Sequence, residues 1–299
     1  MKKTALLVVY NHRYDKNIPI IDKMYEGVFS HVYHLVPFYD GTQENVIPVY
    51  ASSAHFQSYI AQAYTHLRKE GFSHYFVVAD DMLLNPSINE SNYHQLMGLN
   101  EDECYIDELF PLQSSKNLMQ HKAMQFRVKQ HYIEITSIIP TKEEALKKFK
   151  YYDLPTGPLP FPYISFKYND IPILRFKIKS FLLYLLNIKH RHLEYPLMNA
   201  YSDILIIDEN TMPRFCQLCG AFAAANLFVE LAIPTALILS TDKMKTGKDT
   251  RMRGRAYWVR ASYKDKAYLD SFNNSIDAVK KSFKEDQLYI HPIKLSKWK

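Results

Sequence analysis

The chain has 299 residues, of which 47% are hydrophobic and 23% are charged, a composition typical of a globular protein with a sizeable core. Its 37 Lys and Arg residues outnumber its 31 Asp and Glu residues, and the net charge of +6 favours anionic partners. The composition argues against several classes of protein. Eight glycines are few for Gly-rich phosphate loops, three cysteines do not make a disulfide framework, and no apolar run is long enough to span a bilayer. We therefore expect a cytoplasmic protein, with a peripheral position at the inner face of the membrane left open.

Strands and helices alternate in the first part of the chain. Apolar, β-branched runs predict strands over residues 4–12 and 31–40 and another starting at 74. Helical spacing predicts helices over 21–30 and 53–71. This order is typical of a parallel sheet that binds a nucleotide.

The middle of the chain breaks this alternation. Residues 88–195 contain helical pieces and a proline-rich loop, and we interpret them as an insertion or lid that shapes an acceptor site or meets a membrane surface. Strand and helix patterns return with "DILIID" at 203–208. We therefore divide the chain into a nucleotide-binding α/β half (1–87), the insertion (88–195) and an acceptor-side α/β half with a C-terminal tail (196–299).

Two adjacent carboxylates, Asp80 and Asp81, end the apolar strand "HYFVVADD". Open α/β sheets bind their ligands at the carboxyl ends of strands. Like charges repel unless a cation lies near, and Mg²⁺ or Mn²⁺ often binds through one or two carboxylates plus substrate phosphates. A turn or helix cap with solvated carboxylates explains the pair equally well.

Glu230 and His291 are the next candidates. Glu230 interrupts the apolar run "NLFVELAIPTAL", where burial would raise its pKa towards that of a general base; alternatively it faces a cleft edge or pairs with an Arg. His291 precedes Lys294 and Lys297 near the chain end, and such a group could hold a metal ion and a diphosphate. A structural histidine is the alternative.

Three further segments carry a recognisable pattern. The basic run 243–260, with Tyr257 and Trp258, suits either a loop that closes over phosphates or a solvated loop. Residues 175–192 are apolar with basic flanks, which suits either a membrane interface or a buried core helix. The single CxxC at 216–219 lacks a second pair and is interpreted as packing rather than zinc binding.

The order of these features resembles the GT-A fold of nucleotide-sugar glycosyltransferases, in which a DxD metal motif, a glycine loop, an acidic xED position and a C-terminal metal-binding His follow one another. The resemblance implies an α/β fold with a GT-A-like, mostly parallel central sheet flanked by helices and a large mixed middle insertion. It implies that Asp81, Asp80 and His291 bind a divalent metal, Mn²⁺ or Mg²⁺, and that Glu230 is the base of an inverting reaction.

The resemblance also assigns binding residues. Lys297, in "HPIKLSKW", would meet the donor diphosphate, as in the HxxGxxKPW ending of the family. Gly220 and Ala221, in the expected loop "LCGAF", would face the donor or acceptor sugar. The nucleotide would be held by Tyr10, Asn11, Arg13 and Asp40. The chain departs from the family pattern at Ala79, where DxD has its first Asp, and in "VEL", which stands in place of xED. The ending "HPIKLSKW" also departs from it, with Lys294 in place of the Gly and without the Pro.

The expected function is therefore that of a metal-dependent glycosyltransferase. It would move a sugar from a nucleotide-diphosphate donor, with UDP as one candidate nucleotide, to a glycan or lipid-linked acceptor, as in polysaccharide biosynthesis. One alternative is a nucleotidyltransferase, against which the Gly-free "YNHRYDKN" counts. Another is a non-catalytic basic module that binds nucleic acid or a membrane surface. We expect no nucleic acid partner.

Overall fold

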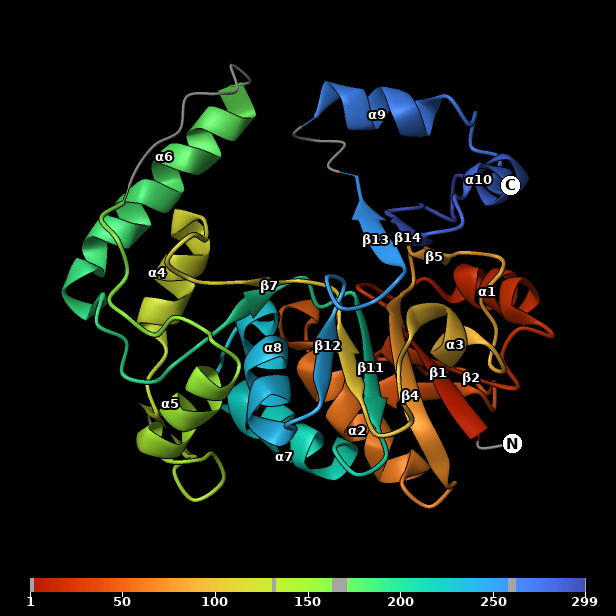
Figure 1. Ribbon diagram of the computed structural model, residues 1–299. Coiled ribbons are helices and arrows are strands. Elements are labelled where there is room, and N and C mark those ends of the chain that lie inside the picture. The colour runs from red at the N-terminus through yellow and green to blue at the C-terminus, as the bar shows by residue number, and fades with distance from the viewer. Residues whose placement is uncertain (1–2, 131–132, 163–170, 258–261, 299) are drawn as a thin grey trace. The chain divides into compact units, whose positions relative to one another are not determined.

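The computed structural model describes residues 3–130, 133–162, 171–257 and 262–298 (Figure 1). The chain forms two compact units. Unit 1 comprises Met1–Glu108, Asp203–Pro213 and Lys243–Lys299, and unit 2 comprises Leu109–Ser202 and Arg214–Asp242.

Unit 1 is built on a seven-stranded sheet with the order β12-β6-β11-β4-β1-β2-β3. Strands β1, β2, β3 and β4 run parallel to one another. Strand β11 runs antiparallel to both of its neighbours, β4 and β6. The prediction of a mostly parallel α/β sheet is therefore confirmed. The strands are β1 (Lys3–Val9), β2 (His31–Pro37), β3 (Val46–Val49), β4 (Phe72–Ala79), β6 (Cys104–Ile106), β11 (Ile204–Asp208) and β12 (Met244–Thr246).

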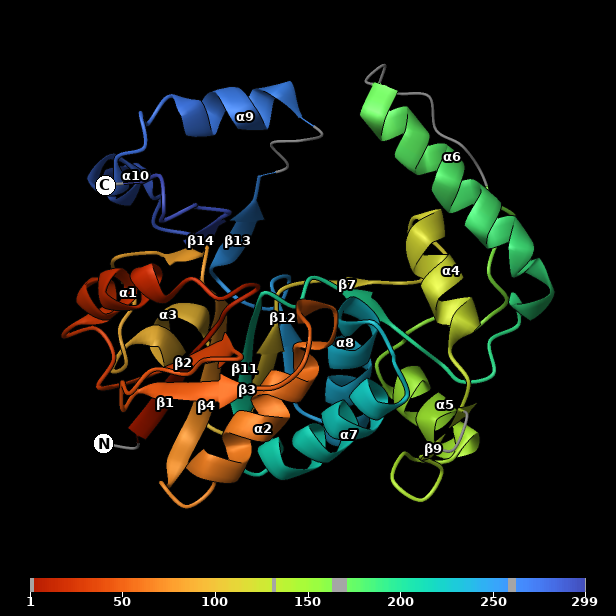
Figure 2. The same cartoon turned by 180° about the vertical axis from the view of Figure 1, so that it is seen from behind.

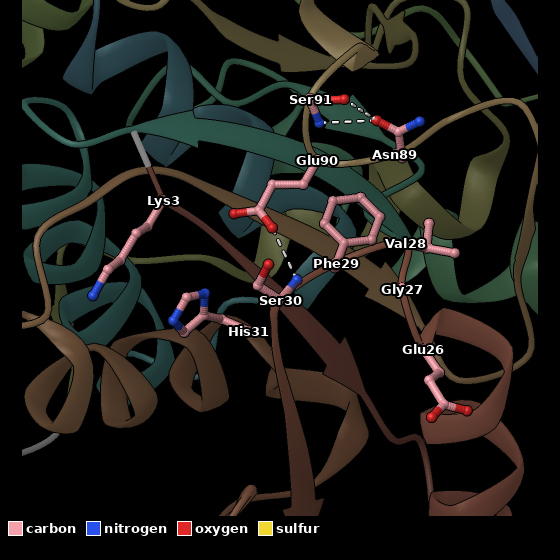
Figure 3. Close-up of a pocket in the computed structure, with 10 residues that line it drawn as sticks. All are labelled: Lys3, Glu26, Gly27, Val28, Phe29, Ser30, His31, Asn89, Glu90 and Ser91. Atoms are coloured by element: carbon pink, nitrogen blue, oxygen red, sulfur yellow. Dashed lines mark hydrogen bonds between the residues drawn. The ribbon is translucent and has the colours of Figure 1, made fainter. Parts of the chain in front are cut away.

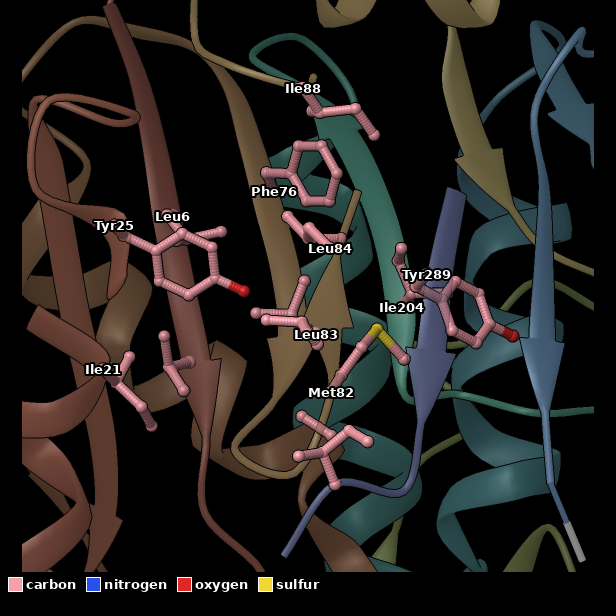
Figure 4. Close-up of a cluster of buried hydrophobic side chains, with 14 of the residues drawn as sticks. Leu6, Ile21, Tyr25, Phe76, Met82, Leu83, Leu84, Ile88, Ile204 and Tyr289 are labelled. Atoms are coloured by element: carbon pink, nitrogen blue, oxygen red, sulfur yellow. The ribbon is translucent and has the colours of Figure 1, made fainter. Parts of the chain in front are cut away.

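The centre of this sheet is apolar on both faces. All eight residues of β4 are buried, as expected for a strand covered on both sides by other elements. Leu6, Phe76 and Ile204, from three neighbouring strands, share one core with Met82 and Leu83 (Figure 4).

Helices of unit 1 connect and cover these strands. Helix α2 packs against β2 and β3, as the reverse view shows (Figure 2). It begins at Gln57, after a short 3-10 helix at Ser53–His55, so the predicted helix over 53–71 is shorter than expected. The helices are α1 (Ile18–Tyr25), preceded by a 3-10 helix at Asp15–Asn17, α2 (Gln57–Leu67), α3 (Tyr93–Met97), α9 (Tyr263–Asp270) and α10 (Ile276–Ser282).

A second, three-stranded sheet joins the chain end to the segment that follows β4. Its order is β13 (Arg253–Ala256), β14 (Gln287–His291) and β5 (Leu83–Leu84). Strand β14 runs antiparallel to β5, with Ile290 opposite Leu83. The basic run 243–260, for which a loop was one expectation, therefore supplies strands β12 and β13, and Trp258 falls outside the described residues.

Unit 2 is mainly helical. Helix α5 starts with a complete capping box between Thr141 and Glu144, and its other end is bonded by Lys148 to Asp242 just after α8. Of the helices in the described part of the chain, none combines the length and the apolar character needed to cross a bilayer. Besides α7 (Met212–Ala224), which enters unit 2 at Arg214, the elements are β7 (Leu109–Phe110), α4 (Asn117–Gln125), β8 (Lys129–Gln130), β9 (Ile133–Glu134), α5 (Lys142–Tyr151), α6 (Ile171–Leu186), a 3-10 helix at Ile188–His190, β10 (Asn199–Ala200) and α8 (Val229–Ser240).

The two units do not coincide with the three segments expected from the sequence. The first unit continues to Glu108 rather than 87, and residues 196–299 are shared between the units. The reason is the sheet: β11, from late in the chain, pairs with β4 and so belongs to the first unit, whereas α8 belongs to the second.

Candidate functional site

Asp80, Asp81 and His291 come together in unit 1. Asp80 directly follows β4, and its backbone N–H donates to the carbonyl of Val9 at the end of β1, at 2.9 Å. Because β14 pairs with β5, which starts at Leu83, the end of β14 lies beside Asp81. His291 Nε2 is 2.9 Å from Asp81 Oδ1. Two residues 210 positions apart therefore form one polar cluster at the carboxyl ends of β1 and β4.

The cluster is strongly charged. Asp80 is 5% exposed, and burial, together with the charge of Asp81, raises the pKa of Asp80 to about 7, although the backbone of Asn11 and the side chain of Asn17 oppose the rise. Burial alone would lower the pKa of His291, but its hydrogen bond with Asp81 and the nearby carboxylates raise it overall. The carboxylates thus favour a positive charge at this position, either on His291 or on a bound cation.

Asp203 is a further acidic residue of this cluster, and it was not expected from the sequence. It directly precedes β11, and its carbonyl accepts the backbone N–H of Ala79 at 2.9 Å. Burial raises the pKa of Asp203, the charge of His291 lowers it, and that of Asp81 raises it further. The only sequence signal was an Asp before an apolar strand. Since β11 is antiparallel to β4, the start of β11 lies at the end of β4.

The donor set suits a divalent cation shared with a phosphate. Within the described residues, no three His, Cys, Asp or Glu side chains already form a group that could hold a metal ion. Asp81 and His291 keep side-chain exposures of 27% and 19%, so a ligand can reach them. Magnesium-type sites commonly use one or two carboxylates and complete their coordination with water and phosphate. Asp81 and His291 therefore fit the expected metal as a partial protein site.

Arg13 and Asp40, two of the residues predicted to bind the nucleotide, contact each other. They follow β1 and β2, and the Arg13 guanidinium bonds both Asp40 and Asp15 on an exposed surface. The hydrogen bond from Arg13 lowers the pKa of Asp40. Asn11, two residues before Arg13 in the chain, is partly exposed. These side chains are accessible to a polar ligand.

Tyr10 does not present its ring to a ligand. The side chain is fully buried, and its hydroxyl lies 2.9 Å from His34 Nδ1. His34 Nε2 in turn lies 2.8 Å from Asp22 Oδ1. The ring of Tyr10 therefore belongs to the interior of unit 1 and offers no face on which a base could stack.

Two other aromatic or basic assignments lie near the chain end. Tyr257 is buried, and its ring stacks on Tyr268 with centroids 4.8 Å apart, so that it too has its partner within the protein. Lys297 is exposed, whereas the neighbouring Trp298 is buried and anchors this segment to the core of unit 1. Lys297 is thus free to extend into solvent.

Glu230 lies in unit 2, in the first turn of α8, and is partly exposed. Lys122 is close enough for the charge of Glu230 to raise its pKa, against a larger lowering caused by burial. The Lys122 ammonium also lies 3.8 Å from the centre of the Phe228 ring. Glu230 therefore has a cationic neighbour. This neighbour is a Lys rather than the Arg of the ion pair that was one alternative for Glu230.

The expected glycine loop is a helix. Gly220 and Ala221 lie inside α7, and Ala221 is buried, so "LCGAF" does not form a loop that faces a sugar. The flanking apolar residues continue the helical pattern through the glycine, which costs only about 1 kcal/mol relative to alanine. Cys216 and Cys219 are buried in the same helix and form no disulfide, as expected for packing residues.

A cavity of about 810 Å³ lies at the other end of the strands (Figure 3). Lys3 and His31, which start β1 and β2, line it. Glu90, also in the lining, accepts the backbone N–H groups of Thr4 and Ser30 at 3.0 and 2.9 Å. None of the predicted site residues lines this cavity, and Glu90 is used to fix the strand ends.

No protein-family profile and no curated protein sequence matches the chain. Among solved structures, it is similar to core-mannan synthase A (CmsA/Ktr4) from Aspergillus fumigatus in its Mn/GDP form, with 10% identity over 84% of this chain and 74% of that chain and a TM-score of 0.38. It is also similar to the mannosyltransferase Ktr4p from S. cerevisiae in complex with GDP, with 10% identity over 83% and 70% of the two chains and a TM-score of 0.38. A second structure of Ktr4p gives 11% identity over 83% and 69%, with a TM-score of 0.37.

Proposed function

We propose that the protein is a glycosyltransferase that uses a nucleotide-diphosphate sugar. The observation that carries this proposal is the Asp81–His291 contact of 2.9 Å beside the buried Asp80, at the carboxyl ends of the central parallel strands. A parallel sheet binds ligands at this edge. A cluster of acidic side chains with one imidazole suits a cation that carries a diphosphate.

The donor would lie across the ends of β1, β2 and β4. Asp81 and His291 would hold a divalent metal, Mn²⁺ or Mg²⁺, which when bound neutralises charge on the leaving diphosphate. Asp80 accepts hydrogen bonds from Asn11 and Asn17 and so fixes the segment after β1. Asn11, Arg13 and Asp40 would bind the nucleoside, and the exposed Lys297 would meet the diphosphate.

Glu230 would remove the proton of the acceptor hydroxyl in an inverting displacement at the anomeric carbon. The C1–oxygen bond to the diphosphate breaks, the acceptor oxygen forms the new bond to C1, and the proton passes to the Glu230 carboxylate. The acceptor would be a glycan or a lipid-linked sugar. The neighbouring Lys122, whose pKa the charge of Glu230 raises against a larger lowering by burial, would place a positive charge beside this carboxylate.

Calorimetric titration tests the donor site. UDP and GDP are titrated into the wild-type protein with Mn²⁺ and with EDTA, and then into Asp81→Ala. The control is Asp277→Ala, which removes an exposed carboxylate from α10. We expect binding of one nucleotide that requires Mn²⁺, is lost in Asp81→Ala and persists in the control. Equal affinity in EDTA, or no binding under any condition, would refute the proposal.

Product analysis separates this function from nucleotidyl transfer. A glycosyltransferase releases a nucleoside diphosphate from the sugar donor, whereas a nucleotidyltransferase releases pyrophosphate from a nucleoside triphosphate. With a donor identified by titration, Glu230→Gln should bind it normally and transfer or hydrolyse it at least ~100-fold more slowly, the usual contribution of a general base. An unchanged rate would remove Glu230 from the mechanism.

A further inference from the structure

Helix α6 of unit 2 packs against the rest of the unit through the face that carries Ser180 and Tyr184. Its buried side chains include Ser180 and Tyr184, and the Tyr184 hydroxyl donates to the carbonyl of Pro160. Just after the helix, Asn187 Nδ2 lies 3.1 Å from His121 Nδ1 of α4. Helices α4 and α6 lie side by side in both views (Figures 1 and 2). This face fixes the helix within unit 2.

The opposite face of α6 is apolar and exposed. Ile178, Leu182, Leu185 and Leu186 are 42%, 54%, 40% and 75% exposed. Their spacing of four, three and one residues places them on one side of the helix. A soluble helix normally carries polar side chains on this side, and contiguous exposed apolar surface marks an interaction site.

Basic side chains lie within and beside the same stripe. Arg175 and Lys179 are exposed, and their spacing to Leu182 and Leu186 places all four on adjoining positions of consecutive turns. Lys189 follows in the next short helix. The sequence contains no Asp or Glu from 171 to 193. The stripe is therefore complementary to a surface that carries negative charge and has an apolar layer beneath that charge.

We propose that α6 lies in the plane of an anionic lipid bilayer. The four apolar side chains would enter the boundary between headgroups and acyl chains, and Arg175 and Lys179 would meet lipid phosphates. Contact in the plane suits a helix that does not have the properties of a membrane span. A protein partner would have to offer an apolar groove with acidic walls. An anionic bilayer provides negative phosphates above an apolar interior without such a groove, and the charges on α6 are satisfied by the phosphates alone.

Vesicle flotation tests the proposal with the intact chain. Wild-type protein is mixed with phosphatidylcholine vesicles with and without phosphatidylglycerol, in low and high salt. We expect binding to the anionic vesicles that weakens as salt rises. The variant Leu182→Ser/Leu186→Ser should bind roughly tenfold more weakly for each leucine lost, and Arg175→Gln/Lys179→Gln roughly fivefold more weakly for each charge.

The control is Ile138→Ser, which removes a 42% exposed isoleucine elsewhere in unit 2 and should leave vesicle binding unchanged. Thermal unfolding checks that each variant is folded. Failure of the wild type to bind anionic vesicles, or equal binding by the leucine variant, would overturn the proposal. So would a wild-type dimer that the leucine substitutions convert to a monomer, because the face would then join two copies. Nucleotide titration of the same variants should be unaffected, so this test can fail independently of the proposed function.

Discussion

Asp80 should destabilise the folded protein at neutral pH, and Asp80→Asn should remove that destabilisation. Burial and the charge of Asp81 raise the pKa of Asp80 from 3.8 to about 7. The folded state therefore binds this proton more tightly than the unfolded state, and its stability falls as pH rises from about 4 to about 7. A shift of about three pKa units corresponds to a loss of about 4 kcal/mol above pH 7, at about 1.4 kcal/mol per unit.

Urea unfolding in EDTA measures this effect. The stability of Asp80→Asn relative to the wild type should be about 3 kcal/mol more favourable at about pH 8 than at about pH 4.5, because the loss is only partly developed at the lower pH. The control Asp277→Asn, at an exposed position on α10, should show no such difference. If the relative stability of Asp80→Asn is the same at both pH values, Asp80 is not held protonated by its surroundings and the electrostatic account of the site is refuted.

Three further substitutions have defined outcomes. Burial and, to a smaller extent, the charge of His94 lower the pKa of His74 to about 4, so the wild type should lose stability as pH falls from 6.5 towards 4. Over that range the free energy of unfolding of His74→Gln, measured in urea, should fall by about 3 kcal/mol less than that of the wild type. Phe76→Ala, at a fully buried position of β4, should lower the free energy of unfolding by about 3–5 kcal/mol, and a loss below 1 kcal/mol would contradict the assigned core. Arg13→Gln, at an exposed position, should leave the melting temperature nearly unchanged but weaken nucleotide binding in calorimetry; unchanged affinity would exclude Arg13 from the donor site.

Local patterns in the sequence were sufficient for β1, β2, β4 and β11, but not for the short strands β3, β6 and β12 of the same sheet. The run Phe72–Ala79 is apolar enough to be buried at every position, and the polar residues that follow mark its carboxyl end. The position of Asp80 and Asp81 at the ligand-binding edge follows from that alone. The position of His291 beside Asp81 could not be predicted from a local pattern, because it depends on the pairing of β14 with β5. Only the resemblance of the chain end to the HxxGxxKPW pattern indicated it.

Two features depended on partners that no local pattern reveals, and a third on a local pattern that was misread. Asp203 lies at the site because β11 runs antiparallel to β4. The hydrophobic pattern of a strand does not predict its direction in the sheet. Tyr10 follows β1 in the same way as Asn11, but its hydroxyl bonds to His34 on the neighbouring strand and its ring is buried. Gly220 was expected in a loop, yet the apolar residues around it have a helical period and place it inside α7.

The alternatives left open for the Asp pair make different demands on the structure. A turn or helix cap would leave both carboxylates solvated and would require nothing of the chain end. Instead, Asp80 is 5% exposed beside a second carboxylate, and Asp81 contacts an imidazole that β14 brings from 210 residues away. Burying like charges is unfavourable unless a positive group offsets it, so the ligand-binding edge of the sheet favours a positive charge, on His291 or on a bound cation. Arrangements of this kind cluster at functional sites, and a cation with its phosphate ligand is the group that would relieve this one.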